Sequence, residues 1–276
     1  MNGTRIKLGV ALRSMGPQST RETFLACARA AEDAGFDDVW VQDHLAIPPD
    51  DAEGSGGRYL DPLGALAFLA GATSRIGLGT AVINLPYRAP LPTAKAIATL
   101  QELSGGRLLL GVGVGWMAPE FRALGVPRAE RGARTDEALA FLADCFANDV
   151  VEAHGQKFLF LPRPPRPPIY VGGMGAHALD RAAKFGDGWM PMARDAAVLR
   201  APIAELRERF AAAGRGTPAV VVLASFSRKE PAVAAASARA FAEAGATHLV
   251  FAERYADADD FRRGLDFASE HLLPAL

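Results

Sequence analysis

The chain has 276 residues, of which 50% are hydrophobic and 22% are charged, so it can bury a large core and is neither disordered nor fibrous. Its 30 Lys and Arg residues nearly balance 31 Asp and Glu residues, and the formal charge of -1 leaves no basic excess to attract nucleic acid. No apolar run approaches the roughly 20 residues of a membrane-spanning helix, so neither nucleic acid nor a membrane is an expected partner.

The N-terminal residues and the two cysteines are typical of a protein of the cytoplasm. Residues Met1–Leu8 contain no long apolar stretch before a small-residue cleavage site, so we expect a cytoplasmic protein. Cys27 and Cys145 each lie in an Ala-rich helical pattern, which favours buried thiols over a disulfide or a metal site. No His, Cys and Asp cluster has metal-ligand spacing, and no Gly-x-Ser-x-Gly motif or evident pair of carboxylates is present. This pattern favours cofactor chemistry over unaided hydrolysis.

Short aliphatic runs alternate with longer helical segments in the first half of the chain. The first strand is expected at 6–12 and its helix at 20–34, where Gly35 suits the left-handed position that ends a helix. A second strand at 38–42 leads into a loop at 43–60, whose length is typical of a functional lid. The next elements are expected as a helix opening at Asp61-Pro62, a strand at 76–83, a helix at 92–103, a strand at 107–114, and helices at 118–124 and 131–147.

The second half continues this alternation after an interruption. A Pro-rich excursion at 150–168 is expected to form a β-hairpin and an extended tether rather than a domain linker. Four further strands are then expected, each followed by a helix. They lie at 169–171, 188–192, 219–226 and 247–251.

Eight strand-helix units in a chain of this length predict a (β/α)8 TIM barrel, with a Pro-rich insertion before strand five. An open, doubly wound sheet is the alternative. It normally has a Gly-rich turn after its first strand, whereas here that strand leads into Arg13–Pro17. No boundary divides the chain, so residues 1–276 are expected to form one barrel domain.

Asp43 and His44 follow the second strand directly. Two titratable side chains at a strand end would lie at the rim where a barrel carries its active site, so both are candidate catalytic residues. The alternative is that Asp43 caps a turn and His44 is an exposed loop residue.

A Gly-rich turn joins the fifth strand to its helix. Free backbone N–H groups and the positive end of a helix bind phosphate, and the later loops of a barrel often hold one. A plain turn without a ligand is the alternative. A second Gly-rich run, Gly111–Trp116, is only a weak dinucleotide fingerprint, because it occurs late in the chain and lacks an acidic residue about 20 positions on at the end of a second strand. The predicted phosphate turn consists of Gly172, Gly173, Met174, Gly175 and Ala176.

Taken in order, these motifs resemble the luciferase-like monooxygenase superfamily, particularly its coenzyme F420-dependent oxidoreductases. The resemblance covers nearly the whole chain, and the ordered set is more specific than any one motif. It is carried by Gly35–Trp40 with Asp43-His44, Asp61-Pro62, Thr73–Thr80, Gly111–Trp116, Arg131-Gly132 and Gly186–Trp189.

The resemblance implies a barrel with a flavin or deazaflavin at its C-terminal mouth. It further implies a cis peptide between Ala81 and Val82, forming a bulge that supports the ring, and it places His44 beside the reacting centre. The turn at 172–176 would hold the cofactor phosphate. Gly113, Val114, Gly115 and Trp116 would border the ring. Some sugar-phosphate dehydrogenases of this family have Glu in place of Trp116, which argues against that substrate class here.

The function implied is hydride transfer between F420 and a small organic substrate, with His44 exchanging a proton with the substrate or hydrogen-bonding its oxygen. The pocket is expected to be roofed by the 43–60 loop and the 148–168 excursion. An FMN-dependent two-component monooxygenase is the alternative, and a barrel that binds a flavin-like ligand without turnover is another. A homodimer is expected, formed by the Ala-rich helices around strands two to four.

Overall fold

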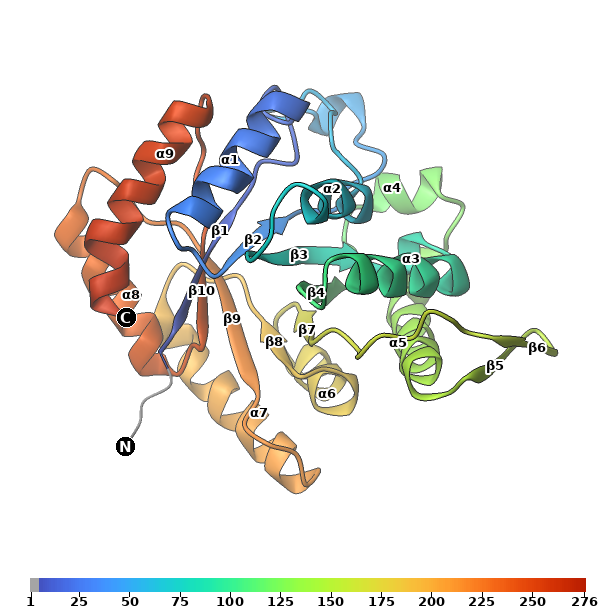
Figure 1. Cartoon of the computed structure of the whole chain (residues 1–276). Helices are drawn as coiled ribbons and strands as arrows, with labels where there is room; N and C mark the ends of the chain where they lie inside the picture. Colours follow the sequence, from blue (N-terminus) through green and yellow to red (C-terminus); the bar gives the residue numbers. More distant parts are fainter. Residues whose placement is uncertain (1–4) are drawn as a thin grey trace.

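Eight parallel strands close into a barrel in the computed structural model, which describes residues 5–276 (Figure 1). The predicted (β/α)8 architecture is therefore confirmed. Residues 1–4, part of the stretch interpreted above as lacking a signal, lie outside the described residues. The strands are β1 (Lys7–Ala11), β2 (Asp38–Val41), β3 (Gly77–Asn84), β4 (Leu108–Gly113), β7 (Ile169–Gly172), β8 (Gly188–Met190), β9 (Ala219–Ala224) and β10 (His248–Phe251), in the spatial order β1-β10-β9-β8-β7-β4-β3-β2.

Helices surround the barrel, and local sequence explains several of their ends. The side chains of Thr20, Asp61 and Asp257 each accept a hydrogen bond from a backbone N–H of the first helical turn, which would otherwise lack a partner. Gly35 follows the first helix with a φ of 80°, as its position predicts. The helices are α1 (Arg21–Asp33), α2 (Pro62–Ala70), α3 (Pro90–Leu103), α4 (Ala118–Ala123), α5 (Arg131–Ala147), α6 (Ala176–Phe185), α7 (Arg200–Ala212), α8 (Pro231–Ala244) and α9 (Ala258–Phe267).

The barrel interior is filled by a cluster of its own, separate from the larger core between strands and helices. Trp40 is its fully buried centre and packs against the ring of Tyr170. Glycine makes room for this indole, because a Cβ at Gly79 would lie 2.2 Å from Cε3 of Trp40. The Trp40 side chain therefore requires glycine at position 79.

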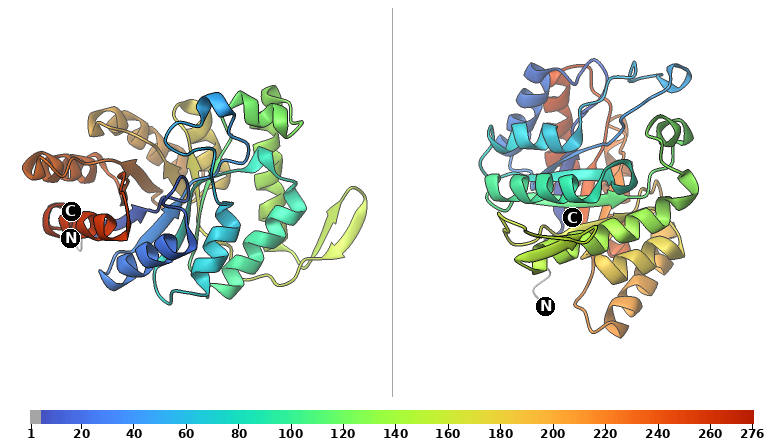
Figure 2. Two further views of the ribbon diagram at one scale, coloured as in Figure 1. Left: turned by 90° about the horizontal axis from the view of Figure 1, so that it is seen from above. Right: turned by 90° about the vertical axis from the view of Figure 1, so that its right-hand side faces the viewer.

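The Pro-rich excursion forms a hairpin of β5 (Val150–Ala153) and β6 (Gln156–Leu159), as predicted, and it extends beyond the outer helices (Figure 2). Its tether is held against α3, where Gln101 Nε2 donates to the Pro165 carbonyl over 3.0 Å. The expectation that 148–168 roofs the pocket is wrong, because none of these residues lines the cavity at the mouth. A segment that leads from a helix into a strand lies where strands begin, at the end of the barrel opposite the mouth.

The buried thiols predicted at Cys27 and Cys145 are confirmed, since both are buried and unbridged. Over the described range 5–276, no helix has the length and apolar character to cross a membrane.

Candidate active site

A cavity of about 440 Å³ opens at the C-terminal ends of the strands, within the range of roughly 300–1,000 Å³ typical of small-molecule sites. Most of the predicted site residues line it. Gly175 and Ala176 lie outside the lining, immediately after Met174. The lining consists of Gln42, Asp43, His44, Ala81, Val82, Asn84, Gly113, Val114, Gly115, Trp116, Gly172, Gly173, Met174, Met190, Pro191, Met192 and Leu223.

Val82 forms part of the cavity wall, packed against glycines of two neighbouring strands. A Cβ at Gly113 would lie 2.4 Å from Val82 Cγ2, and one at Gly172 would lie 2.8 Å from Val82 Cγ1. The Ala81–Val82 peptide is cis, and the pairing of β3 with β4 shifts register between Thr80 and Ile83. The expected cis peptide and bulge are both confirmed at this wall.

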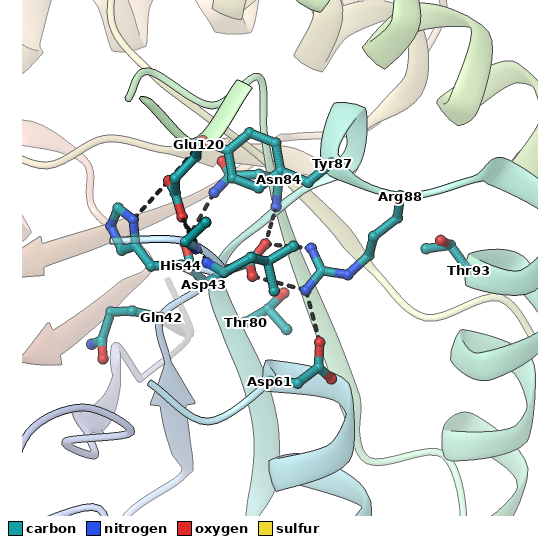
Figure 3. A network of polar contacts seen from close by, with 12 residues as sticks. Gln42, Asp43, His44, Asp61, Thr80, Asn84, Tyr87, Arg88, Thr93 and Glu120 are labelled. Carbon is teal, nitrogen blue, oxygen red and sulfur yellow. Dashed lines mark hydrogen bonds and ion pairs between the residues drawn. The ribbon is translucent and has the colours of Figure 1, made fainter. Parts of the chain in front are cut away.

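His44 is held at the cavity by Glu120, a residue of α4 that the sequence analysis did not single out (Figure 3). The distance from His44 Nδ1 to Glu120 Oε2 is 3.0 Å, and the Glu120 side chain is completely buried whereas that of His44 is 17% exposed. The ring of Tyr59 lies against His44, with centroids 4.9 Å apart, so the end of the 43–60 loop borders the site.

Glu120 is an ionised buried carboxylate. Its other contacts are the Leu45 and Ala46 N–H groups, which donate to Oε1 over 2.6 and 3.1 Å, and the Tyr87 hydroxyl, which donates to Oε2 over 3.0 Å. Burial alone would raise the pKa of Glu120, but the hydrogen bonds from His44, Leu45 and Ala46 lower it to about 2. An ionised carboxylate accepts only, so Nδ1 of His44 donates to Glu120, and in that tautomer Nε2 is the acceptor of the ring.

Asp43, beside His44, is committed to an ion-pair network (Figure 3). Arg88 donates to both of its oxygens, over 2.6 and 2.8 Å, and also to Asp61 over 2.8 Å. The Asn84 N–H donates to Asp43 Oδ2 over 2.7 Å, and the Asn84 side-chain amide donates to the Asp43 carbonyl over 3.1 Å. The carboxylate of Asp43 therefore joins the ends of β2 and β3 and the start of α2.

The Gly-rich turn leaves backbone donors without a partner next to the cavity. Within the described chain, the N–H groups of Met174, Gly175, Ala176 and His177 have no hydrogen-bond acceptor. Trp189 is fully buried and donates its indole N–H to the Gly173 carbonyl over 2.7 Å. That bond turns the carbonyl inward. The turn therefore has the free donors that an anion needs.

Glu120 and Arg88 differ in how far sequence could have revealed them. Arg88 lies between β3 and α3, where no motif in the sequence marks it. Glu120 lies in the short helix after strand four, and a lone carboxylate near the catalytic end of a barrel is the one signal that could have drawn attention to it. No group of three or more His, Cys, Asp or Glu side chains in residues 5–276 is arranged to hold a metal ion.

Residues 5–272 match the family described as luciferase-like monooxygenase. The chain belongs to this family. Membership makes it an oxidoreductase and confirms the family resemblance inferred from its ordered motifs.

Two relatives from Mycobacterium tuberculosis are about one third identical to this chain over the aligned residues. A protein described as uncharacterized is 35% identical over 219 residues, which cover 72% of this chain and 77% of that protein. An F420-dependent hydroxymycolic acid dehydrogenase is 34% identical over 196 residues, which cover 68% of this chain and 53% of that enzyme.

Solved structures share the fold at lower identity. Monooxygenase RslO1 from Streptomyces bottropensis has a TM-score of 0.79 at 22% identity, covering 98% of this chain and 99% of that one. An F420-dependent secondary alcohol dehydrogenase in complex with an F420-acetone adduct has a TM-score of 0.78 at 20% identity, with the same coverage. The oxygenating constituent of 3,6-diketocamphane monooxygenase from Pseudomonas putida, in complex with FMN, has a TM-score of 0.78 at 16% identity and covers 98% of both chains.

Proposed function

We propose that this protein exchanges a hydride between coenzyme F420 and a small organic substrate. The observation that carries the proposal is that His44, whose Nε2 is an acceptor, lines a cavity next to a turn with free backbone donors. A proton-handling group and an anion site thus lie close together at the barrel mouth. The F420-dependent name of a relative 34% identical to this chain favours F420 over FMN.

The residues present fit the cofactor. Val82, between Gly113 and Gly172, would support one face of a planar ring, because at both glycines a side chain would fill the space that Val82 occupies. The N–H groups of 174–177 would bind the cofactor phosphate. We propose as cofactor-binding residues Ala81, Val82, Gly113, Val114, Gly115, Trp116, Gly172, Gly173, Met174, Gly175 and Ala176.

When bound, F420 supplies a two-electron carrier that takes a hydride from an alcohol carbon or gives one to a carbonyl carbon. His44 Nε2 takes the hydroxyl proton in the first direction, and the imidazolium returns it in the second. Glu120 keeps the ring in one orientation and tautomer and stabilises the imidazolium, as a carboxylate partner of a catalytic His does elsewhere. His44 is thus the catalytic residue of the proposal and Glu120 a positioning residue.

Asp43 receives a positioning role here instead of the catalytic one expected from its place at the strand end. Its oxygens are occupied by the Arg88 guanidinium and the Asn84 N–H. Both oxygens of this carboxylate are therefore held by donors of the protein itself. It instead fixes the backbone from which His44 projects.

The proposal is tested by titrating the protein with F420 and with FMN and by measuring turnover of His44→Ala. We expect F420 to bind at least about tenfold more tightly than FMN, a difference of about 1.4 kcal/mol. His44→Ala should lower turnover by about 100-fold or more while F420 affinity changes little. His154→Asn in the distant hairpin is the control. Tight FMN binding with an oxygen-dependent product would contradict the cofactor assignment, and unchanged His44→Ala turnover would contradict the catalytic one.

We further propose that two copies associate through the groove between α2 and α3. A cavity of about 850 Å³ lies there, larger than the one at the mouth, and its lining is mainly apolar with small residues such as Ala67, Ala70 and Ala96. Small side chains allow helices to approach closely, and Leu103 at its edge is 74% exposed. A second copy of this chain would cover these groups.

A further inference from the structure

Three large apolar side chains surround the opening of the cavity at the barrel mouth. Trp116 is 64% exposed, Met174 is 52% exposed and Met192 is 74% exposed. They come from three separate loops, after β4, β7 and β8, and all three line the cavity. Single exposed apolar residues are common on proteins, but several that converge on one opening are typical of a site for an apolar ligand.

The same lining contains no Lys or Arg. Arg88 lies behind Asp43 and is shared between Asp43 and Asp61, so its charge is already compensated. Arg128 donates to the Trp116 carbonyl and lies outside the lining. A carboxylate or phosphate on the substrate would therefore lose its hydration without gaining a counter-charge, which is unfavourable.

Polar groups of the lining are also few. Asn84 is tied to Asp43 through both its backbone N–H and its side chain, and Asp43 is paired with Arg88. The polar side-chain groups left for a ligand are the Gln42 amide, whose Oε1 also accepts from Ser14 Oγ over 3.3 Å, the Trp116 indole N–H and the Nε2 atom of His44. A sugar with many hydroxyl groups would leave most of them unpaired on an apolar rim, which costs free energy for each buried group.

We propose that the substrate is an uncharged, mainly apolar alcohol or ketone. This inference rests on the proposed function and specifies its substrate class. The hydroxyl or carbonyl oxygen of the substrate contacts His44 Nε2. The hydrocarbon part of the substrate packs against Trp116, Met174 and Met192. The two methionines are unbranched and flexible, so the rim can adapt to chains of different shape.

Direct binding tests this class without turnover. Trp116 is the exposed indole, whereas Trp40 and Trp189 are completely buried, so changes in fluorescence report on the rim. With F420 bound, 2-octanone and 2-octanol should change the emission with affinities at least about tenfold higher than octanoate or a hexose phosphate. Trp116→Phe should remove the signal, and calorimetry should then still show the same order of affinities. Equal or tighter binding of octanoate or the hexose phosphate would overturn the proposal.

A charge placed on the rim gives a second test. Met192→Lys adds an ammonium group at a site exposed enough to tolerate it, and Met192→Leu is the matched control. Octanoate should bind at least about tenfold more tightly to the Lys variant than to the Leu variant, while 2-octanone should bind more weakly to the Lys variant because its hydrocarbon part loses an apolar contact. No gain for octanoate would show that Met192 does not face the substrate and would overturn the proposal.

F420 binding and ligand preference separate the proposed function from the substrate class. Failure of the wild-type protein to bind F420 would refute the proposed function whatever the rim prefers. Binding of F420 together with a preference for the anionic ligands would refute the substrate class alone.

Discussion

His44 and Glu120 are 76 residues apart in the sequence, yet they share a 3.0 Å contact in which Glu120 is completely buried. Sequence could place Asp43 and His44 at a strand end, and therefore at the mouth, because a barrel fixes where strands end. It could not pair His44 with Glu120, since that contact depends on how the loop after β4 turns back across the mouth. For the same reason it could not show that Arg88 saturates Asp43.

Replacing Glu120 by Gln should lower turnover by about 100-fold, with much smaller changes in KM and in F420 affinity. The amide offers an N–H group as well as an oxygen, so it no longer enforces the proton on Nδ1 of His44. Nitrogen NMR of the imidazole should show one tautomer in the wild type and a mixture in Glu120→Gln. Tyr87→Phe, which removes one donor to Glu120, is the control with a smaller effect. Unchanged turnover and an unchanged tautomer would refute the positioning role.

Asp38 inside the barrel predicts a pH-dependent stability. Burial raises the pKa of Asp38 to about 7, against the opposing hydrogen bond from the Trp40 indole. The folded state therefore binds a proton more tightly than the unfolded state, whose Asp pKa is about 4. The free energy of unfolding therefore falls as the pH rises from about 4 to 7. The loss due to Asp38 is at most about 4 kcal/mol.

The variant Asp38→Asn removes this titration while keeping an oxygen for Trp40. Relative to the wild type, its free energy of unfolding should rise between pH 5 and pH 8, as measured by denaturant unfolding at each pH. Asp50→Asn, at an exposed position, is the control and should show no such change. A difference in the free energy of unfolding between Asp38→Asn and the wild type that stays constant from pH 5 to pH 8 would contradict the raised pKa of Asp38.

At the scale of elements, most strands and helices were predictable from period and turn residues. The α5 helix, for example, begins and ends where the pattern predicts, at Arg131 and Ala147. The main error was to place the 148–168 excursion over the pocket. Its composition correctly indicates a hairpin with a tether, but the direction in which it extends depends on its place before β7.

The phosphate turn depends on backbone geometry that glycine permits. Gly175 precedes α6 with φ 89° and ψ 176°, which an L-residue adopts only at a cost of about 1–3 kcal/mol, although no atom lies within 4 Å of an added Cβ. Gly175→Ala should therefore move the N–H groups and weaken F420 binding at least about tenfold, measured by titration. Gly216→Ala, also in open space but without positive φ, is the control. Unaltered affinity in Gly175→Ala would place the phosphate elsewhere.

For the whole molecule, eight strand-helix units in the sequence predict the barrel. A strand glycine such as Gly79 leaves the space that the Trp40 side chain needs inside it. The groove between α2 and α3 was not predictable in detail, because helix composition shows that a face is apolar but not that two helices leave a cavity between them. The expected homodimer remains a prediction that this groove supports.

Charge placed in the groove should separate the copies. Ala67 is exposed and lines the groove, so Ala67→Glu should leave the fold intact while opposing burial of the interface. Light scattering should show a dimer for the wild type and a monomer for Ala67→Glu. Ala236→Glu, at an exposed position of α8, should remain dimeric. A wild-type monomer at all concentrations would refute the dimer.

The central claim is that a planar redox cofactor occupies the mouth with its phosphate on the turn at 172–176. A crystal structure of the protein with F420 tests it most directly. We expect the ring against Val82, with its substrate-facing side toward His44, and the phosphate oxygens within hydrogen-bonding distance of the N–H groups of Met174, Gly175 and Ala176. Density for F420 outside this cavity, or a phosphate bound away from that turn, would contradict it.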